Sequence, residues 1–392
     1  MKILSIETSC DETGLAIVQA EGGFLNPKFK VLKNLVSSQI KIHRPFGGVV
    51  PNLAKREHIK NLPLLYKKLL SSKFQVPSSI DLIAVTVGPG LEPALWTGIT
   101  FAEELSRKTK KPLIGANHLE GHLYSFLLQQ KRANLKSQIR NQKQKSLEFK
   151  ISDLKFPAIA LLVSGGHTAI LLMKNLKEWK MLGETRDDAA GEAFDKVARM
   201  LKLHYPGGPE IEKIAKKGNP DAIEFPKPML NQKNYDFSFS GLKTAVFYYL
   251  RDIGYSHSGI ATRVGKKNLN PKPHTLVADV AASFQKTVVE VLARKTERAA
   301  IEFSARSMIL CGGVAANKTL RKELKRTADG LGINFFVPEM EYNNDNGAMI
   351  AAAGYFAYLK GSKSAKGACL PARQGSASGG KLPMKADGDL NI

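Results

Sequence analysis

The chain has 392 residues, 43% of them hydrophobic, so it is long enough for two domains with a core each, and a wholly disordered protein is excluded. Its 58 lysines and arginines outnumber its 35 aspartates and glutamates, which gives a formal net charge of +23. Glu7 interrupts the first apolar residues, so we expect no secretory signal. The longest stretch free of charged or strongly polar residues, residues 347–359, is well short of the roughly 20 residues of a membrane span. We therefore expect no membrane association, and three cysteines without a close pair predict a reducing, cytoplasmic setting.

In the first part of the chain, short strands are expected to alternate with helices. Two apolar runs joined by a polar connection predict a hairpin, and the helix that starts at Pro51 contains Pro63, which should kink or split it. Strands that alternate with helices predict a largely parallel sheet. The expected elements are strands at residues 2–6 and 14–18, a helix at 51–70, a strand at 81–87, a helix at 93–107 and a strand at 112–116.

A second strand–turn–strand pattern, at residues 158–163 and 169–173, repeats the first and suggests that the two halves of the chain are duplicates. Residues 359–392 are rich in small residues, lysine and proline, and predict a disordered tail without core residues. The other elements expected in this half are helices at 189–203 and 276–303, a strand at 308–311, a helix from about residue 315 and an alanine-rich segment at 344–358.

Positive charge is concentrated in three segments. Residues 28–73 contain eleven lysines and arginines against one acid, Glu57; residues 131–155 contain eight against two acids, and residues 258–274 contain four against none. Such clusters suit a nucleic-acid partner, because each neutralised phosphate releases counterions. The alternative is that these lysines are ordinary solvated surface residues.

Two histidines have the spacing of metal ligands. His118 and His122 are four residues apart, so a helix would place both imidazoles on one face, where they can bind one ion. Asp345, ahead of the last helix, would complete a two-histidine, one-carboxylate set that suits zinc or ferrous iron. The alternative is an ordinary pair of helix histidines that cap or pack. A metalloprotease would have glutamate directly after the first histidine, but Leu119 holds that place and Glu120 points off the shared face.

Three turns of small residues, at 164–166, 207–209 and 312–317, offer bare N–H groups that can cradle a phosphate. Each could also be a plain turn. Two nearby acids, Asp195 and Glu212, could hydrogen-bond ribose hydroxyls. Together, the glycine turns and the acids favour a nucleotide pocket.

Two cysteines and two phenylalanines near these motifs have both a chemical and a packing interpretation. Cys10 and Cys311 could be nucleophiles, but buried inert thiols are more common. Phe237 and Phe239 could stack on a base, but core packing is the better interpretation. We assign none of the four a catalytic or binding role.

Seven motifs occur along the chain in an order too specific to arise from separate turns. They are residues 7–13, 47–51, 118–122, 163–168, 187–196, 205–209 and 236–244. Together they closely resemble the tRNA N6-adenosine threonylcarbamoyltransferases, in particular the bacterial branch, and the likeness runs from residue 1 to about residue 354. Asn344 stands where that family commonly has threonine, and Cys311 replaces a small residue, but neither departure removes a ligand.

The resemblance implies an α/β protein with the duplicated, two-lobed, RNase H-like fold of actin, sugar kinases and heat-shock ATPases. Four parts of the chain are implied. They are an N-terminal lobe at residues 1–116, a C-terminal lobe with the metal and adenylate site at 117–343, a terminal helix at the lobe interface at 344–358 and a disordered tail at 359–392.

The resemblance also implies an activity, in which threonylcarbamoyl-adenylate donates its threonylcarbamoyl group to N6 of adenosine 37 in tRNAs that read codons starting with adenine, and AMP leaves. It implies one divalent metal ion per subunit, Fe²⁺ or else Zn²⁺, bound by His118, His122 and Asp345. Glu12 and Asp11 would orient the threonyl group or relay a proton. The implied contacts to the adenylate are Leu162, Val163, Ser164, Gly165, Gly166, Asp195, Gly208, Glu212 and Asn317.

By the same resemblance, the partners would be tRNA, a non-catalytic paralogous subunit and a small ATPase subunit (TsaB- and TsaE-like). The basic segments at 129–155 and 258–274 are longer than is usual in the family, and we expect Lys143, Lys145 and Lys150 to contact tRNA. Three other functions are possible for these residues: a small-molecule kinase of the same fold, a metallopeptidase and a purely binding subunit.

Overall fold

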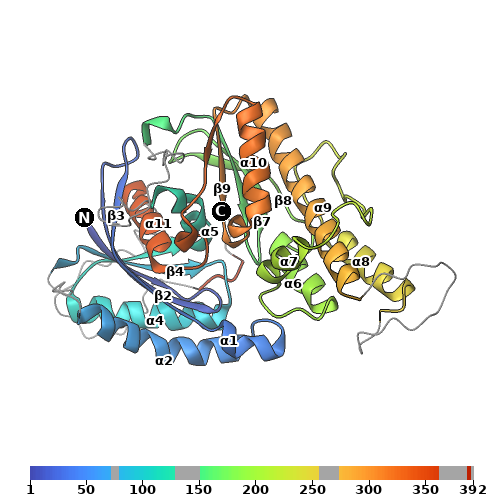
Figure 1. Ribbon diagram of the computed structural model, residues 1–392. Coiled ribbons are helices and arrows are strands. Elements are labelled where there is room, and N and C mark those ends of the chain that lie inside the picture. Colours follow the sequence, from blue (N-terminus) through green and yellow to red (C-terminus); the bar gives the residue numbers. More distant parts are fainter. Residues whose placement is uncertain (72–78, 129–150, 256–272, 362–385, 390–392) are drawn as a thin grey trace, which may run out of the picture. The chain divides into compact units, whose positions relative to one another are not determined.

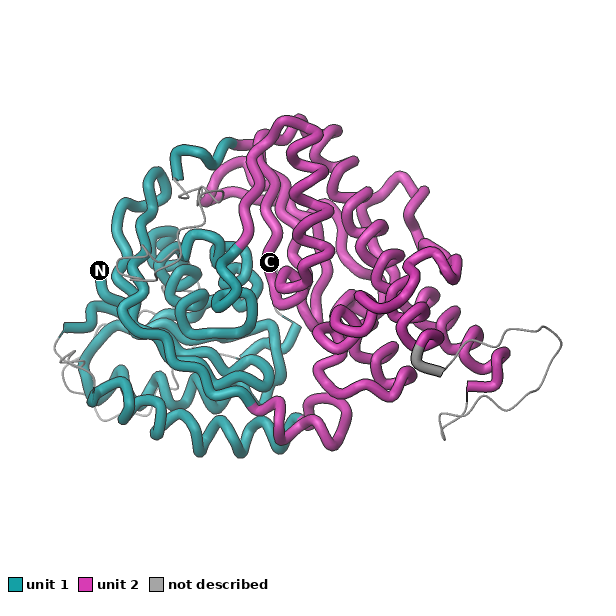
Figure 2. Tube along the Cα trace, in the orientation of Figure 1, with its two compact units in different colours: residues 1–38, 51–155, 338–392 teal, residues 39–50, 156–337 magenta. Residues whose placement is uncertain are grey.

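A computed structural model describes residues 1–71, 79–128, 151–255, 273–361 and 386–389 (Figure 1). The chain forms two compact units, each assembled from separate stretches of sequence (Figure 2). Unit 1 comprises Met1–Ser38, Pro51–Lys155 and Pro338–Ile392, and unit 2 comprises Gln39–Val50 and Phe156–Val337. None of the described helices combines the length and the apolar content that a transmembrane span requires.

Unit 1 is built on a mixed sheet of five strands, β1 (Lys2–Glu7), β2 (Glu12–Glu21), β3 (Lys28–Ser38), β4 (Leu82–Gly88) and β5 (Leu113–Asn117). Their order is β3-β2-β1-β4-β5, with antiparallel pairs on the β3 side of β1 and parallel pairs on the β5 side. The helices of this unit are α2 (Pro51–Leu70), α4 (Glu92–Thr109), α5 (His118–Tyr124) and α11 (Gly347–Lys360), with short 3₁₀ turns at Ser125–Leu127, Ile151–Asp153 and Met340–Tyr342.

Helices cover both faces of this sheet, with α2 and α4 on one side and α5 and α11 on the other (Figure 1). The central strands β1 and β4 are therefore buried along almost their whole length, as expected for strands covered on both faces. The α11 side is packed closely, because a Cβ atom at Gly354 would lie 2.5 Å from the Cβ of Ala84 in β4. This packing holds the middle of α11 against β4 of the sheet.

Unit 2 contains a second mixed sheet, formed by β6 (Ala158–Val163), β7 (Thr168–Met173), β8 (Trp179–Glu184), β9 (Ser307–Cys311) and β10 (Asn334–Phe336). Its core contains the edge-to-face pair Phe194 and Phe284, with ring centroids 5.2 Å apart. The helices of this unit are α1 (Ile40–His43), α6 (Ala190–Met200), α7 (Gly207–Ala215), α8 (Ser240–Asp252), α9 (Pro273–Glu302) and α10 (Lys318–Gly330), with 3₁₀ turns at Arg44–Phe46 and Gly313–Ala316.

The second sheet repeats the first in order and in strand direction. Read from the antiparallel edge, its order is β8-β7-β6-β9-β10, which matches β3-β2-β1-β4-β5 strand for strand. The pairs on the β8 side of β6 are antiparallel, and those on the β10 side are parallel. The prediction of a duplicated α/β fold is therefore confirmed. The repeated strand–turn–strand pattern in the sequence corresponds to the first two strands of each sheet.

The two units divide the chain differently from the boundaries at 116 and 343 that the sequence suggested. The segment after β5 stays in unit 1, because α5 packs against α11 and against the strands of the first sheet. Residues 39–50 belong to unit 2, although they lie between two elements of unit 1. Both assignments depend on contacts between residues far apart in the chain, and such contacts cannot be seen in the order of residues alone.

Most elements expected in unit 1 are present with shifted ends. Pro63 lies inside α2 and does not split it. Several elements were not expected: β3, β8, β10, α7 and α8. The three strands among them lie at the edges of the sheets, where polar residues interrupt the apolar pattern, and β10 has only three residues.

The expectation of a tail without core residues is corrected for residues 386–389. The N–H of Asp387 donates to the carbonyl of Val87 at 2.8 Å, and the N–H of Gly90 donates to the carbonyl of Gly388 at 3.1 Å. Ala386 packs against the core of unit 1. The chain end thus satisfies backbone groups that β4 leaves unpaired. Residues 359 and 360, also assigned to the tail, belong to α11.

Candidate functional site

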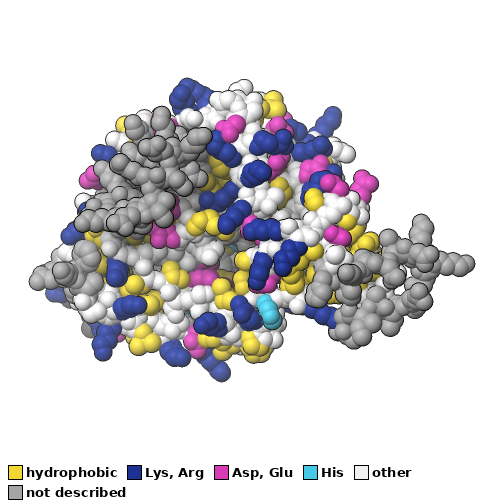
Figure 3. All heavy atoms as spheres, viewed as in Figure 1, with side chains coloured by type: hydrophobic (Ala, Val, Ile, Leu, Met, Phe, Trp, Pro, Cys, Tyr) yellow, Lys and Arg dark blue, Asp and Glu magenta, His cyan; other side chains and the backbone are white. Residues whose placement is uncertain are grey.

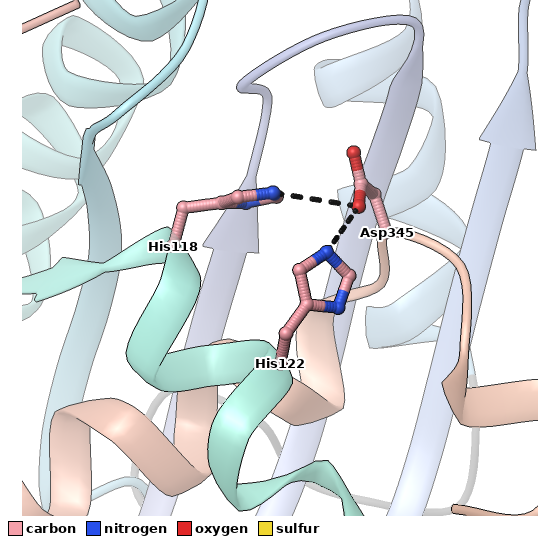
Figure 4. Close-up of side chains that lie close together, drawn as sticks. All are labelled: His118, His122 and Asp345. Atoms are coloured by element: carbon pink, nitrogen blue, oxygen red, sulfur yellow. Dashed lines mark ion pairs between the residues drawn. The ribbon is translucent and has the colours of Figure 1, made fainter. Parts of the chain in front are cut away.

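Three side chains of unit 1 converge at one point. The Oδ1 atom of Asp345 lies 3.1 Å from Nε2 of His122 and 3.5 Å from Nε2 of His118 (Figure 4). The two imidazole centroids are 4.7 Å apart. One possible ligand atom from each residue lies within 4.8 Å of the other two. The structure thus brings together the three residues that the sequence analysis selected.

Local sequence explains the placement of the two histidines. Asn117 ends β5 and caps α5, since its Oδ1 accepts hydrogen bonds from the N–H groups of Leu119 and Glu120. His118 is therefore the first helical residue, and His122 follows one turn later on the same face. Asparagine is a preferred N-cap, so this signal was present in the sequence.

Asp345 is held by the turn that precedes α11. Asn346 caps that helix through the N–H of Met349 at 3.1 Å, and its amide donates to the carbonyl of Asn344 at 2.8 Å. Gly121 lets α5 approach α11, because a Cβ atom there would lie 3.1 Å from Ile350 and 3.2 Å from Met349. Residues more than 200 positions apart in the chain are thereby fixed side by side.

The glycine at the start of α11 predicts a measurable packing cost. A Cβ atom at Gly347 would lie 2.6 Å from the nitrogen of Ala16 and 2.7 Å from the carbonyl carbon of Leu15. We expect Gly347→Ala to lower the free energy of unfolding by about 1–3 kcal/mol, since backbone must move to admit the methyl group. Urea denaturation measures this, with Gly330→Ala as control, because a Cβ atom at Gly330 meets nothing within 4 Å. Equal midpoints for the two variants would contradict the prediction.

The donor set fits a divalent transition ion. His122 is 1% exposed, and neither of its ring nitrogens has a hydrogen-bond partner among the described residues; its approach to Asp345 lacks hydrogen-bond geometry. A buried imidazole without partners is costly unless a ligand satisfies it. Two nitrogen atoms and a carboxylate oxygen suit Zn²⁺ or Fe²⁺. These residues could therefore hold the metal ion that the sequence suggested.

The metalloprotease alternative finds no support in the position of Glu120. Its Oε1 lies 2.7 Å from Nζ of Lys360, and its side chain is 12% exposed. A general base must reach a water bound at the metal position, whereas this carboxylate forms an ion pair with the end of α11.

The charges around the metal position act on His118 in the metal-free protein. Burial alone would lower its pKa, but the negative charges of Asp345 and Glu7 outweigh burial and raise the pKa to about 9. This exceeds the ordinary value of 6.5, so protonation stabilises the metal-free fold below pH 6.5, and the contribution is lost as pH rises through about 9.

Metal uptake should consequently depend on pH. Because a metal must displace the proton of His118, we expect the apparent affinity for Co²⁺ to rise about tenfold per pH unit from pH 7 to pH 9 and then to level off. Competition with a chelator, followed by the visible spectrum of bound Co²⁺, measures this. An affinity that is the same at pH 7 and pH 9 would contradict the assignment.

The β1–β2 turn adds a second group of acids beside the site. Burial raises the pKa of the Glu12 carboxyl well above its ordinary value, and the charges of Asp11 and Asp345 add to the effect. Burial, followed by the same negative charges, also raises the pKa of the Cys10 thiol. Cys10 is therefore a thiol rather than a thiolate at neutral pH, which agrees with the inert interpretation.

His58 of α2, which the sequence analysis did not select, fixes this turn. Its Nδ1 lies 2.8 Å from the hydroxyl oxygen of Thr13, and its Nε2 lies 2.9 Å from the carbonyl oxygen of Cys10. The side chain is fully buried. A lone histidine in a basic helix carries no signal of this role.

In unit 2, the polar residues selected as adenylate contacts also have partners within the protein. Oδ1 of Asp195 accepts from the N–H of Gly207 at 2.6 Å, at the start of α7. Oε1 of Glu212 accepts from the N–H of Lys318 at 3.1 Å, at the start of α10. Asn317 caps α10 through the N–H of Leu320. Asp195 thus links α6 to the start of α7, and Glu212 links α7 to the start of α10.

Three glycines of the selected turns have open space around them, whereas Gly207 and Gly312 of the same turns are closely packed. A Cβ atom at Gly165, Gly166 or Gly208 would meet nothing within 4 Å, and none of the three has a left-handed backbone. Neither packing nor conformation requires glycine there, which fits the close approach of a ligand. Gly191 differs, because a Cβ atom there would lie 2.5 Å from the carbonyl oxygen of Ser164. The first turn of α6 thus packs directly against the glycine turn.

The remaining selected residues lie in the core. Leu162 and Val163 end β6, and each residue is 0% exposed. Phe237 and Phe239 are also fully buried, which confirms the packing interpretation. Cys311 is buried and its pKa is raised by burial. Lys143, Lys145 and Lys150 lie outside the described residues, as does most of the segment 258–274.

The chain is similar to one protein family, to relatives in other organisms and to a solved structure. The family model described as tRNA N6-adenosine threonylcarbamoyltransferase matches residues 30–136 and 144–352. A protein of that name from Thermosipho africanus is 46% identical over 361 residues, which cover 92% of this chain and 96% of that protein. One from Moorella thermoacetica is 45% identical over 358 residues, covering 91% and 92%. A solved structure of T. kodakarensis HypF matches 92% of this chain and 48% of its own, with 15% identity and a TM-score of 0.54, which supports the fold alone.

Proposed function

This chain belongs to the tRNA N6-adenosine threonylcarbamoyltransferase family, and we propose that it transfers the threonylcarbamoyl group from threonylcarbamoyl-adenylate to N6 of adenosine 37 in tRNAs that read codons starting with adenine, with release of AMP. The observation that carries the proposal is the convergence of His118, His122 and Asp345 in a chain with this relationship. The net charge of +23 suits a polyanionic acceptor.

The reaction explains why such a cluster would be needed. An exocyclic aromatic amine is a poor nucleophile because its lone pair is delocalised, so the donor carbonyl must be made unusually electrophilic. We propose that His118, His122 and Asp345 hold one divalent ion, Fe²⁺ or Zn²⁺, which would act as a Lewis acid toward the donor carbonyl or the departing phosphate. The lack of a hydrogen-bond partner for either ring nitrogen of His122 among the described residues supports this assignment.

The adenylate would bind to unit 2. We propose that the backbone N–H groups of Gly165, Gly166 and Gly208 hold its phosphate, supported by the open space around these glycines. The residues proposed to complete the binding site are Leu162, Val163, Ser164, Asp195, Glu212 and Asn317. Of these, Asp195 and Glu212 would bind ribose hydroxyls in addition to accepting from the first N–H groups of α7 and α10.

Proton transfer is assigned to the β1–β2 turn. The attacking amine must lose a proton, and Glu12 and Asp11 are the acidic side chains that the turn places near Asp345. We propose that they relay this proton or orient the threonyl group. Burial, and after it the negative charges of Asp11 and Asp345, raise the pKa of Glu12, which supports a proton held at this position.

The partners follow from the relationship. We propose that the chain works in the cytoplasm on tRNA, together with a non-catalytic paralogous subunit and a small ATPase subunit. On the face shown in Figure 3, lysine and arginine side chains are spread over much of the described surface, with acidic side chains among them. This distribution supports contact with a phosphate backbone over a broad area.

The test is direct transfer. The full chain, its partner subunits, threonylcarbamoyl-adenylate and unmodified tRNA are incubated, and the nucleosides are analysed by mass spectrometry. We expect the threonylcarbamoyl mass increment on adenosine and formation of AMP. No modified nucleoside from metal-loaded protein with all partners present would overturn the proposal, and peptide cleavage or phosphoryl transfer to a small molecule would point to the other two enzyme classes.

A further inference from the structure

We propose that Glu7 is a positioning residue for His118, whose carboxylate fixes the tautomer and the ring plane of this imidazole so that Nε2 is the nitrogen presented to the metal. The inference rests on the proposed metal centre and deepens it. Glu7 is the last residue of β1 and is fully buried; it enters the sequence analysis only as the residue that interrupts the first apolar run and begins the motif at residues 7–13.

Each oxygen of the Glu7 carboxylate has a defined partner. Oε1 accepts from the main-chain N–H of Ser9 at 2.5 Å, and Oε2 accepts from the hydroxyl of Thr86 in β4 at 2.6 Å. The same Oε2 lies 3.2 Å from Nδ1 of His118. A carboxylate with partners on both oxygens cannot rotate freely, so its orientation is set before His118 is considered.

This arrangement decides where the imidazole proton lies. A carboxylate only accepts hydrogen bonds, so contact with Glu7 places a proton on Nδ1 of His118. Ser9 Oγ also lies 3.1 Å from Nδ1, but a hydroxyl donates or accepts as required and imposes no tautomer. The lone pair of the neutral ring is then on Nε2, the atom that faces Asp345 at 3.5 Å. This is the tautomer that a metal ligand requires.

The neighbouring histidine supplies a contrast within the same site. Nδ1 of His122 is buried and has no hydrogen-bond partner among the described residues. One ligand is therefore oriented before a metal arrives, while the orientation of the other depends on the packing of α5 and on the metal itself.

A purely structural role for Glu7 does not explain why a charged carboxylate is buried at this position. Ser9 and Thr86 alone could be joined by a neutral side chain, whereas burying a carboxylate completely is costly unless charge-assisted bonds offset the cost. His118 is the partner that a neutral substitute cannot serve in the same way. In Glu7→Gln, the carbonyl must stay on Ser9 N–H, so the amide NH₂ faces Nδ1 and would move the ring proton to Nε2.

The first measurement needs no substitution. Histidine-labelled full-length protein is loaded with Zn²⁺, and long-range ¹⁵N–¹H NMR identifies the protonated nitrogen of each ring, with His118→Gln used for assignment. We expect His118 to carry its proton on Nδ1 and to bind Zn²⁺ through Nε2. Coordination through Nδ1 would overturn the inference.

The second measurement compares Zn²⁺ affinity by competition with a chelator. We expect Glu7→Gln to weaken binding about 10–100-fold. The matched control is Ser9→Ala, which removes the other oxygen near Nδ1 but keeps the main-chain N–H that Glu7 binds; we expect it to change affinity by less than about tenfold. Unchanged affinity in Glu7→Gln, or equal losses in both variants, would refute the role of Glu7.

The two levels of the proposal fail separately. If the unchanged protein binds no Zn²⁺ through His118, the metal centre itself is wrong. If it binds Zn²⁺ through Nε2 but Glu7→Gln binds equally well, the centre stands and the positioning role does not. Should Glu7→Gln fail to fold, the NMR result on the unchanged protein still decides the tautomer.

Discussion

In His122→Ala, and equally in His118→Ala, we expect transfer to tRNA to fall at least about 1,000-fold, because loss of the metal removes several kcal/mol of stabilisation from the transition state. Each variant leaves two of the three converging ligand atoms, and two ligands hold a divalent ion weakly. The rate of formation of the modified nucleoside, measured by mass spectrometry with saturating donor, gives the effect. Metal content by elemental analysis should fall with it.

His204→Ala is the matched control for these variants, since His204 is an exposed histidine in the same chain. It should keep full activity and full metal content. The fold of the His122 variant should persist, because its ring nitrogens make no hydrogen bond within the described residues that would be lost. Full activity in a His122→Ala protein without metal would contradict the proposed chemistry.

Filling the glycine turn of unit 2 should abolish donor binding while the fold survives. We expect Gly166→Val to weaken binding of the adenylate by about 100-fold or more, because the added side chain would hold the phosphate away from the N–H groups of the turn, a loss comparable to that of one preorganised donor. A Cβ atom at this position meets no protein atom within 4 Å, so the added side chain clashes only with a ligand. Isothermal titration with AMP as a stable mimic of the leaving group measures the loss.

The thermal unfolding midpoint separates this effect from misfolding. Gly166→Val should unfold near the temperature of the unchanged protein, whereas Gly191→Val should unfold much lower, because a Cβ atom there collides with the backbone of Ser164 and Gly165. If Gly166→Val binds AMP as well as the unchanged protein does, the turn does not hold the phosphate.

Local sequence rules predicted the histidine pair well. Helical spacing of four residues depends only on the residues between, and Asn117 supplies the cap that starts α5 at His118. Asp345 could not be joined to the pair by spacing, since its position depends on the packing of α11 against α5. It was selected as a carboxylate that could complete the set, and the resemblance to a family implied the same residue.

The roles of Glu7, Asp195 and Glu212 show what a linear pattern omits. Each carboxylate accepts from an N–H group, and two of these donors, in Gly207 and Lys318, lie 12 and 106 residues away. Backbone N–H groups look alike in every residue, so their partners are invisible until the chain is folded. Strand β3 escaped notice for a similar reason, because lysines at alternate positions of an edge strand resemble a charged surface loop.

The duplicated hairpins have a consequence for how the two halves tolerate change. In each unit four residues join the first two strands, at positions 8–11 and 164–167. The earlier loop works through side chains that crowd around buried acids, so conservative exchanges there alter charge or reach. Its later counterpart contains Gly165 and Gly166, where a Cβ atom meets no protein atom within 4 Å, so under the proposed function a larger residue there would clash with the ligand alone. The two loops occupy the same place in the duplicated fold, yet they should tolerate different substitutions. The first is constrained by the side chains that it carries, and the second by the side chains that its glycines lack.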